Sequence, residues 1–209
     1  MNRAEKEYLI REQKIIKSAR KLFIRFGFEN VSLNQIAKEA EFGKSTLYYY
    51  FKNKNELFYK VIRSQDIVRL RSCQAAFNRA ISPMQKILNY LTEYYIFAKK
   101  DYVFYMLSYD YEFIFYRKII PYLSPELVDK YEKYFINDAI ELTKQLHLGE
   151  EDGCLLTMQD KDFLLGYIMS TTRGFIFYIL QQLFVTNTIT EEKADEYYNL
   201  HLNMILHTL

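Results

Sequence analysis

Residues 42–54, "FGKSTLYYYFKNK", carry two sets of side chains that suit different chemistry. The Gly-Lys-Ser-Thr run resembles the end of a phosphate-binding loop, and such a loop would make the chain a nucleotide-hydrolysing enzyme. The overlapping Thr-Leu-Tyr-Tyr-Tyr-Phe run instead predicts a short helix that presents amines and hydroxyls to an outside partner. The elements around this stretch decide between the two interpretations.

The phosphate loop fails on its glycine spacing and on the element that precedes it. The loop requires Gly-x-x-x-x-Gly-Lys-Ser/Thr, so with Gly43 and Lys44 as the closing pair the first glycine would be residue 38. That residue is Lys38. The loop must also follow a strand, whereas residues 32–42 have the periodicity of a helix. The nucleotide-hydrolysing interpretation is therefore rejected.

Three helices are predicted around the stretch instead. Apolar residues recur at three- and four-residue steps over 15–26, and Gly27 ends that helix. A second helix follows Ser32 as its N-cap. After the turn 41–43, a third helix runs from Lys44 to about Phe51. Two helices joined by a short turn and packed on a preceding helix form a helix-turn-helix.

The third helix has an inward anchor and an outward polar face. Leu47 and Phe51 lie one turn apart and face inward. The outward positions are then Ser45, Thr46 and Tyr49, and the flanking positions are Lys44, Tyr48 and Tyr50. Three consecutive tyrosines span about 200° of a helix, so they cannot all be buried in a small three-helix unit. This pattern suits a recognition helix that contacts base edges and phosphates.

Charge is spread unevenly along the chain. Residues 1–54 hold 12 Lys and Arg against 6 Asp and Glu, whereas residues 55–209 hold 16 against 20. A basic N-terminal part indicates an anionic partner, with nucleic acid favoured over a membrane surface, although ordinary surface variation explains the charge equally well. We predict a DNA-binding domain over 1–54 and a ligand-binding and dimerisation domain over 55–209.

Residues 14–58 resemble the DNA-binding domain of the tetracycline-repressor (TetR) family of bacterial transcription regulators. The resemblance is carried by Ala19 and Phe23, by Gly27-Phe28, by "SLNQIAKEA" and, most specifically, by "KSTLYYYFKNKNELF". Two positions depart from the family pattern. Glu41 stands where the family has Gly in the turn, and Gly43 stands where the family caps the third helix with Ser or Thr. These departures bear on the tilt of the third helix.

The resemblance implies particular DNA contacts. The expected groove readers are Lys44, Ser45, Thr46 and Tyr49. The expected phosphate contacts are Tyr48, Tyr50 and Lys54, and Ser32 with Asn34 would touch the backbone or an outer base. Lys54 is favoured because the N-terminus of a helix itself attracts phosphate.

The rest of the chain predicts an all-α protein of about nine helices, because helix starts recur and Gly and Pro are few. The predicted starts are at Asn53, Ser82, about Asp101, Ser124, Thr157 with Asp160, and Thr190. The apolar run 163–180 contains Arg173, which favours a buried helix over a membrane span. We expect a cytoplasmic protein without a cofactor or a metal, since neither the cysteines nor the histidines have metal-ligand spacing.

In the resembled family the C-terminal helices form a ligand pocket and a dimer interface. Nine aromatic residues lie between Tyr102 and Tyr122, as core or as pocket walls. The candidate pocket residues are Tyr105, Tyr109, Phe113, Arg173 and Phe177, and they suggest a hydrophobic or aromatic effector. Arg173 would hold an anionic ligand group, or pair with Asp110 or Glu112 instead.

A row of small residues suggests where two copies meet. The candidate dimer residues are Gly166, Ser170 and Gly174, spaced so that another helix can approach closely. In the alternative interpretation, which ranks second, the same row accommodates a neighbouring helix within the subunit.

We predict a dimeric, ligand-responsive transcriptional regulator, a repressor that a small molecule releases from a palindromic operator. The alternative is a helical adaptor of the same fold that regulates a partner protein. An enzyme acting on hydrophobic molecules ranks third, because no nucleophile, base and orienting group come together in the sequence.

Overall fold

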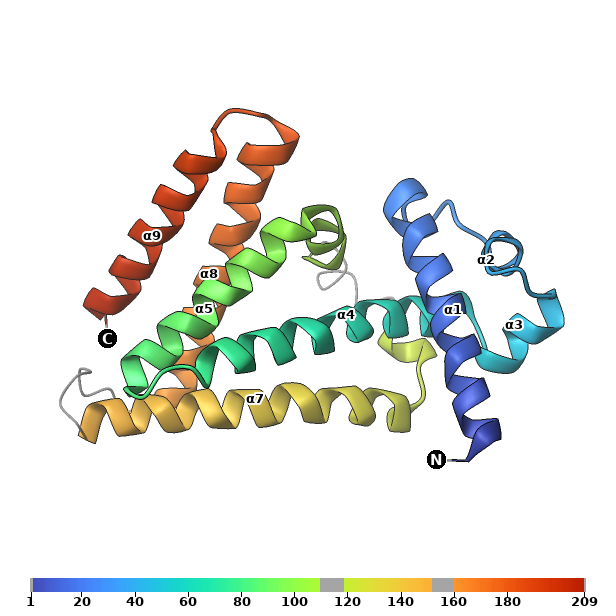
Figure 1. Ribbon diagram of the computed structural model, residues 1–209, viewed down its shortest axis with the longest axis horizontal. Coiled ribbons are helices and arrows are strands. Elements are labelled where there is room, and N and C mark those ends of the chain that lie inside the picture. The colour runs from blue at the N-terminus through green and yellow to red at the C-terminus, as the bar shows by residue number, and fades with distance from the viewer. Residues whose placement is uncertain (1, 110–118, 152–159, 209) are drawn as a thin grey trace. The chain divides into compact units, whose positions relative to one another are not determined.

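The structure is a computed structural model that describes residues 2–109, 119–151 and 160–208 (Figure 1). The chain divides into two compact units. The first comprises Met1–Asp66 with Leu107–Lys130, and the second comprises Ile67–Met106 with Tyr131–Leu209. The DNA-binding domain predicted for residues 1–54 falls entirely within the first unit, which also includes the first turns of the next helix.

The first unit begins with helices α1 (Arg3–Phe26), α2 (Leu33–Glu39) and α3 (Lys44–Tyr50), followed by the start of α4 (Lys54–Phe77). It also contains the short 3-10 helix η1 (Ile120–Tyr122) and the start of α7 (Pro125–Glu151). Helix α1 packs on α2, and α2 packs on α3. The buried side chains of these helices include Ile15, Ile16, Ala19, Phe23, Ile36, Ala37, Leu47, Leu57 and Phe58.

Helix α1 starts about three turns before the predicted helix over 15–26. Asn2 caps it in a capping box with Glu5: the Asn2 side chain accepts from the Glu5 N–H at 2.8 Å, and Glu5 accepts from the Asn2 N–H at 2.9 Å. The helix ends as predicted at Gly27, where φ is +75°, a value that favours glycine.

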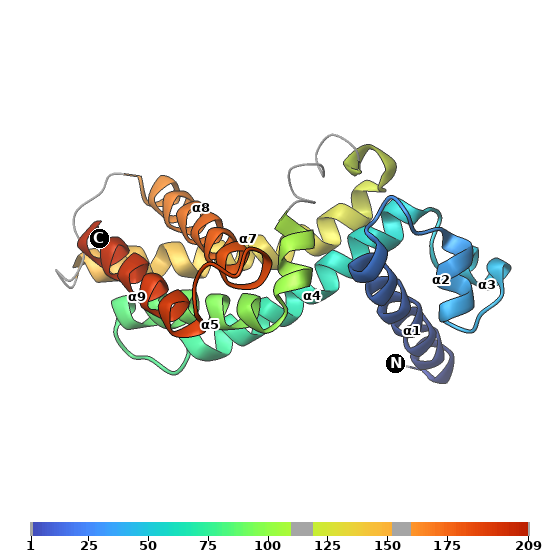
Figure 2. The same ribbon diagram turned by 90° about the horizontal axis from the view of Figure 1, so that it is seen from above.

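The second unit holds the end of α4, α5 (Pro83–Lys100), most of α7, α8 (Lys161–Leu180), the π-helix η2 (Gln181–Val185) and α9 (Glu191–Thr208). Figures 1 and 2 show α8 and α9 running side by side, and α5 packs against both. Residues 102–109 are also helical. The remainder of the helix predicted from about Asp101 to Tyr116 lies outside the described residues.

The prediction of an all-α fold is confirmed, and the described residues contain no strand. Several predicted starts are found in place. Ser82 caps α5 with Pro83 in the first turn, and the Asp160 side chain caps α8 by accepting from the Phe163 N–H at 2.8 Å.

Buried tyrosines make up much of the core of the second unit. The Tyr198 hydroxyl donates to the Leu91 carbonyl at 2.6 Å, and the Tyr105 hydroxyl donates to the Arg173 carbonyl at 2.9 Å. Backbone carbonyls thus satisfy these hydroxyls inside the protein. Cys73 is also fully buried in this core, and burial raises the pKa of its thiol to about 12.

Within the described part of the chain, the segment Lys161–Val185 is long and apolar enough to cross a membrane by length and composition alone. Core helices of soluble proteins meet the same criterion. Leu164, Ile168 and Ile176 of α8 are buried in the core of the second unit, which accounts for part of the apolar composition of this segment.

Candidate nucleic-acid interface

Helix α3 is held by two apolar anchors and leaves its polar side chains exposed. Leu47 and Phe51 are fully buried, which confirms the inward positions predicted for them. Lys44 and Ser45 are exposed, and Thr46 is half-buried. Tyr49 is 75% exposed and Tyr48 is 47% exposed. The short helix therefore presents an amine, a hydroxyl and two phenols on one accessible surface.

Tyr50 does not lie where it was predicted. It was expected beside backbone phosphates, but it is buried, with only 7% of its surface exposed. Its ring packs against the ring of Tyr8 on α1, with centroids 4.6 Å apart. The flanking position predicted for Tyr50 is therefore wrong, because an aromatic partner far away in sequence covers it.

Lys54 also turns inward. Its ammonium donates to the Phe28 carbonyl at 2.9 Å and to the Glu29 carbonyl at 3.3 Å, and it lies 4.3 Å from the centroid of the Phe28 ring. The side chain thus stabilises the turn between α1 and α2. This position conflicts with the predicted phosphate contact, since two of the three ammonium donors already have protein partners.

Ser32 and Asn34 stand at the start of α2. The Ser32 hydroxyl accepts from the Gln35 N–H at 3.3 Å, and Gln35 Oε1 accepts from the Ser32 N–H at 2.7 Å, so the two residues form a capping box. The Ser32 side chain thus caps the N-terminus of α2, as predicted. Asn34 is exposed in the first turn.

The turn between α2 and α3 contains both departures from the family pattern. Glu41 has φ +59°, in the left-handed region that favours glycine. Its carboxylate accepts from the Lys14 ammonium at 2.5 Å, and this hydrogen bond lowers the pKa of Glu41. Gly43 is the N-cap of α3 in extended backbone, with no side chain to satisfy the first N–H groups of the helix.

The N-terminal half of α1 was not predicted from the sequence. Tyr8 meets Tyr50 and also Tyr49, the latter edge-on at 6.2 Å between centroids. Glu12 accepts from the Lys60 ammonium of α4 at 2.9 Å, and both side chains are nearly buried. Tyr8, Glu12 and Ile15 follow one another at helical spacing, which is the signal that could have extended the predicted helix.

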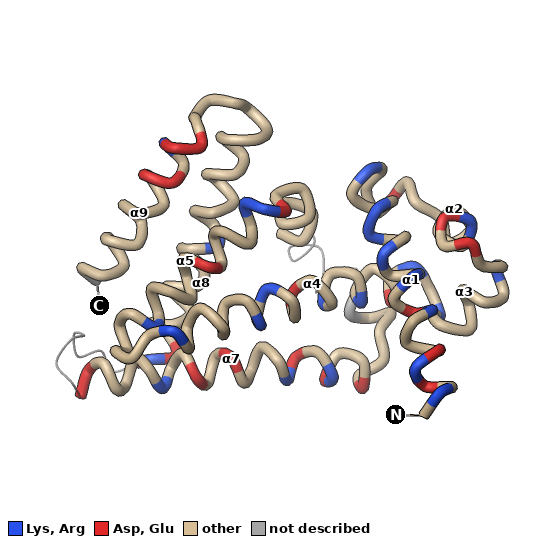
Figure 3. Tube along the Cα trace, viewed as in Figure 1, with Lys and Arg blue, Asp and Glu red and all other residues tan. Residues whose placement is uncertain are grey.

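Positive charge is not concentrated on α3. Figure 3 shows Lys and Arg mixed with Asp and Glu along α2 and the N-terminal half of α1, whereas the C-terminal half of α1 carries Lys and Arg alone. Part of the positive charge is paired within the unit, as in the Lys21–Glu39 ion pair at 2.6 Å between these two helices. A nucleic-acid partner would therefore meet a mildly basic surface around α3.

The candidate effector residues occupy mixed positions in the second unit. Tyr105 is buried, whereas Tyr109, Arg173 and Phe177 are half-buried. Phe113 lies outside the described residues. The burial of Tyr105 agrees with a role in core packing. The ligand pocket expected around these residues stays a prediction.

The candidate dimer residues lie on the outer side of α8. Gly166 and Ser170 are exposed, and Gly174 is half-buried. On the same helix Phe163 is 66% exposed and Tyr178 is 51% exposed. On the neighbouring helix α9, Leu200 and Met204 are also exposed. Small residues and large apolar residues therefore share an accessible surface on these two helices.

The helix α2, the turn at Glu41–Gly43 and the outward-facing helix α3, all supported by α1, define a helix-turn-helix domain. Residues 15–61 match the family model of bacterial regulatory proteins, tetR family. The N-terminal part of the chain thus carries a DNA-binding domain of the TetR family type.

A helix-turn-helix-type transcriptional regulator of Staphylococcus aureus (strain USA300) is 40% identical over 87 residues, a match that covers 40% of this chain and 47% of that protein. The match thus spans just under half the length of the curated relative.

Solved structures resemble almost the whole chain. The fatty acid degradation regulator FadR of Bacillus halodurans has a TM-score of 0.70 at 16% identity and covers 95% of this chain and 96% of its own. FadR of Bacillus subtilis, solved in complex with stearoyl-CoA, has a TM-score of 0.67 at 15% identity and covers 94% and 98%. At these identities the likeness concerns the fold.

Proposed function

We propose that the protein is a transcriptional regulator that binds DNA through α3, as a homodimer in the cytoplasm, and leaves a palindromic operator when a small molecule binds its second unit. The exposure of the polar side chains of α3 over the buried anchors Leu47 and Phe51 carries this proposal. A recognition helix requires this combination, because the anchor fixes the direction in which the reading side chains point.

The proposed contacts follow from exposure. Lys44, Ser45, Thr46 and Tyr49 would meet base edges in the major groove. Tyr48 and Asn34 would meet the sugar-phosphate backbone, which positions the protein on the duplex. Ser32, Tyr50 and Lys54 would act indirectly, because their side chains are engaged within the first unit.

Dimerisation is supported by the accessible apolar surface of α8 and α9. Two-fold pairing there would bury Phe163, Tyr178 and Met204, and the row Gly166, Ser170 and Gly174 would allow close approach. The two copies of α3 would then address successive major-groove turns, about 34 to 36 Å apart or a multiple of that distance.

Release by a small molecule is supported by two observations. A FadR of the same fold is known in complex with stearoyl-CoA, so this fold accommodates small-molecule ligands. Helix α4 begins in the first unit and ends in the second. A ligand that prefers one position of the end of α4 would change the population of states able to bind the operator, and a repressor would leave its DNA.

Selection from a random DNA library followed by fluorescence anisotropy tests DNA binding. We expect enrichment of a palindrome whose affinity falls steeply with salt concentration. Lys44→Ala and Tyr49→Ala should each weaken specific binding at least tenfold while the unfolding temperature stays unchanged. Lys133→Ala serves as the matched control, because it removes the same charge from an exposed position of α7 in the second unit.

Three outcomes would contradict the proposal. The selection could enrich no sequence, or binding could be insensitive to salt. Alternatively, the protein could capture a protein partner without retaining DNA, which would favour the helical adaptor.

A further inference from the structure

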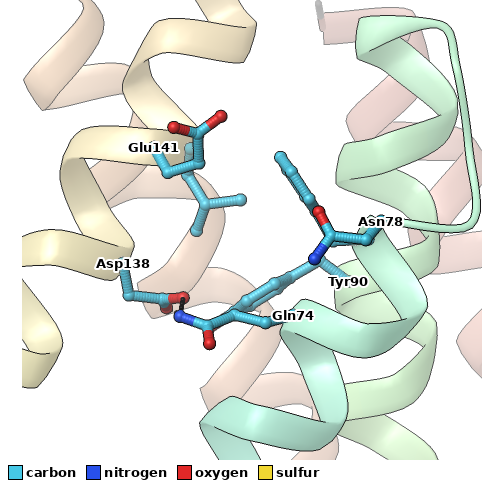
Figure 4. A pocket seen from close by; sticks show the side chains of 7 residues that line it. Gln74, Asn78, Tyr90, Asp138 and Glu141 are labelled. Carbon is cyan, nitrogen blue, oxygen red and sulfur yellow. Dashed lines mark hydrogen bonds between the residues drawn. The ribbon is translucent and has the colours of Figure 1, made fainter.

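A pocket of about 160 Å³ lies in the second unit between α4, α5 and α7 (Figure 4). Its buried floor consists of Phe77, Tyr90, Asp138 and Leu142. Its rim consists of the exposed side chains of Gln74, Asn78 and Glu141. The pocket thus combines an apolar and aromatic floor with a few polar groups, the usual composition of a small-molecule site.

A buried carboxylate forms part of the floor. Asp138 is only 7% exposed. It accepts a short hydrogen bond from the Tyr90 hydroxyl and a second from Gln74 Nε2 at 3.3 Å. A carboxylate offers about four acceptor positions, so the carboxylate of Asp138 retains capacity for further donors. Burial raises the pKa of Asp138, although the hydrogen bonds from Tyr90 and Gln74 and the charge of Arg69 act in the opposite direction.

The side chains that line the pocket include acids, and the nearby Lys and Arg side chains lie outside this lining. Two of the lining residues, Asp138 and Glu141, are acids, and none is Lys or Arg. Gln145 Nε2 donates to Glu141 at 3.0 Å. The Arg69 guanidinium lies over the Tyr94 ring at 4.3 Å, and the Lys86 ammonium lies 5.4 Å from the centroid of the Phe77 ring. One aromatic wall of the pocket is therefore already in contact with a cation.

We propose that this pocket binds a small organic cation, an ammonium group attached to an apolar or aromatic body. The ammonium would lie between Asp138 and Glu141, and the body would pack on Phe77, Tyr90 and Leu142. The pocket has about the volume of five water molecules, so the enclosed part of the ligand is small. The inference rests on the proposed function because it names the chemical class of the small-molecule effector which that function requires.

Isothermal titration of the full chain without DNA tests the site with three probes of one shape. Benzylamine is cationic at neutral pH, benzyl alcohol is neutral and benzoate is anionic. We expect benzylamine to bind at least tenfold more tightly than benzyl alcohol, and benzoate to show no binding. Equal affinities for the amine and the alcohol would overturn the inference.

Variants locate the charge that recognises the amine. Asp138→Asn keeps the shape of the side chain and should weaken amine binding at least tenfold, and Glu141→Gln should weaken it a few-fold. Asp129→Asn removes an exposed carboxylate from the same helix and should change nothing. Unchanged affinity in Asp138→Asn would contradict the proposal. Should that variant fail to fold, Asn78→Trp at the rim should block the mouth and abolish binding, and undiminished affinity would contradict the site.

The failure of this inference is distinguishable from that of the proposed function. The titration uses no DNA, so a protein that binds an operator but no amine would refute the inference and leave the DNA-binding proposal intact. Conversely, amine binding that leaves operator affinity unchanged would support the site and refute its role as the effector site.

Discussion

The ring of Tyr8 on α1 packs against the ring of Tyr50 on α3, with centroids 4.6 Å apart and planes inclined by 34°. The same Tyr8 ring meets the exposed Tyr49 edge-on. Burial raises the pKa of both Tyr8 and Tyr50, as expected for phenols withdrawn from water. The N-terminal half of α1 therefore supports the helix that presents the candidate DNA contacts.

Replacing Tyr8 with Ala should loosen this support. An aromatic pair contributes about 1 kcal/mol beyond the burial of its area, so the free energy of unfolding should fall by at least that amount. Operator affinity should fall as well, since the neighbouring Tyr49 loses a contact. Urea unfolding and anisotropy measure the two effects. Tyr8→Phe is the control because it keeps the ring, and a Tyr8→Ala protein with parental stability would contradict the packing role.

Replacing Glu41 with Gly should stabilise the first unit. Glycine adopts the φ of +59° without strain, and the ion pair lost with Lys14 is exposed and contributes little. The unfolding temperature should rise by a few degrees. The Glu41→Ala variant keeps the backbone strain and also loses the ion pair with Lys14. Its unfolding temperature should therefore be no higher than that of the parent protein. Calorimetry measures the unfolding temperatures of both variants. A Glu41→Gly variant less stable than the Glu41→Ala variant would contradict backbone strain at residue 41.

Replacing Gly43 with Ser should strengthen the start of α3. The backbone there is extended, and an added Cβ would meet Ser45 Oγ at 3.8 Å and Thr46 Oγ1 at 4.0 Å, which are ordinary contacts. The Ser hydroxyl could accept from a free N–H of the first turn. We expect stability in the order Ser, Gly, Ala at this position, with about 1 kcal/mol between Ser and Ala. Chemical denaturation of the three proteins gives the order directly.

Asp138 should make the stability of the protein depend on pH. Burial is the largest effect on its carboxyl and raises the pKa above the ordinary value of 3.8, although Tyr90, Gln74 and Arg69 act in the opposite direction. Between the unfolded and folded pKa values the folded state binds more protons, so this residue lowers stability as pH rises. Asp138→Asn should therefore match the parent near pH 3 and become relatively more stable as pH rises to 7.

Urea unfolding of the two proteins at several pH values measures this difference. A constant offset across the pH range would show that Asp138 does not titrate as its burial requires. Asp129→Asn again serves as the control, because the exposed carboxylate of Asp129 should confer no such trend.

Local spacing was sufficient to predict the helix-turn-helix. Leu47 and Phe51 lie one turn apart, and that spacing alone fixes which face of α3 is buried. Ser82 with Pro83, and Gly27 after an apolar stripe, are likewise short-range signals that the structure bears out. The left-handed backbone found at Glu41 agrees with the glycine that the resembled family has at this position.

The errors all arise from contacts between residues distant in sequence. Tyr8 contributes to the burial of Tyr50 from a distant part of the sequence, and the many charges around Tyr8 obscure the helical pattern of that segment. Lys54 turns away from the surface because the carbonyls of Phe28 and Glu29 come within its reach. The pocket around Asp138 draws on three helices, and the spacing within any one of them does not reveal it.

The burial of Cys73 gives the second unit an internal reporter of its own opening. A thiol whose pKa is raised to about 12 is almost entirely protonated at neutral pH, and only the thiolate reacts with alkylating reagents. Once Cys154 has been replaced by Ser, the rate of modification would report how often the core around Cys73 opens and exposes the thiol. A ligand that stabilises this unit would slow the reaction, so one chemical step could screen candidate effectors without any DNA.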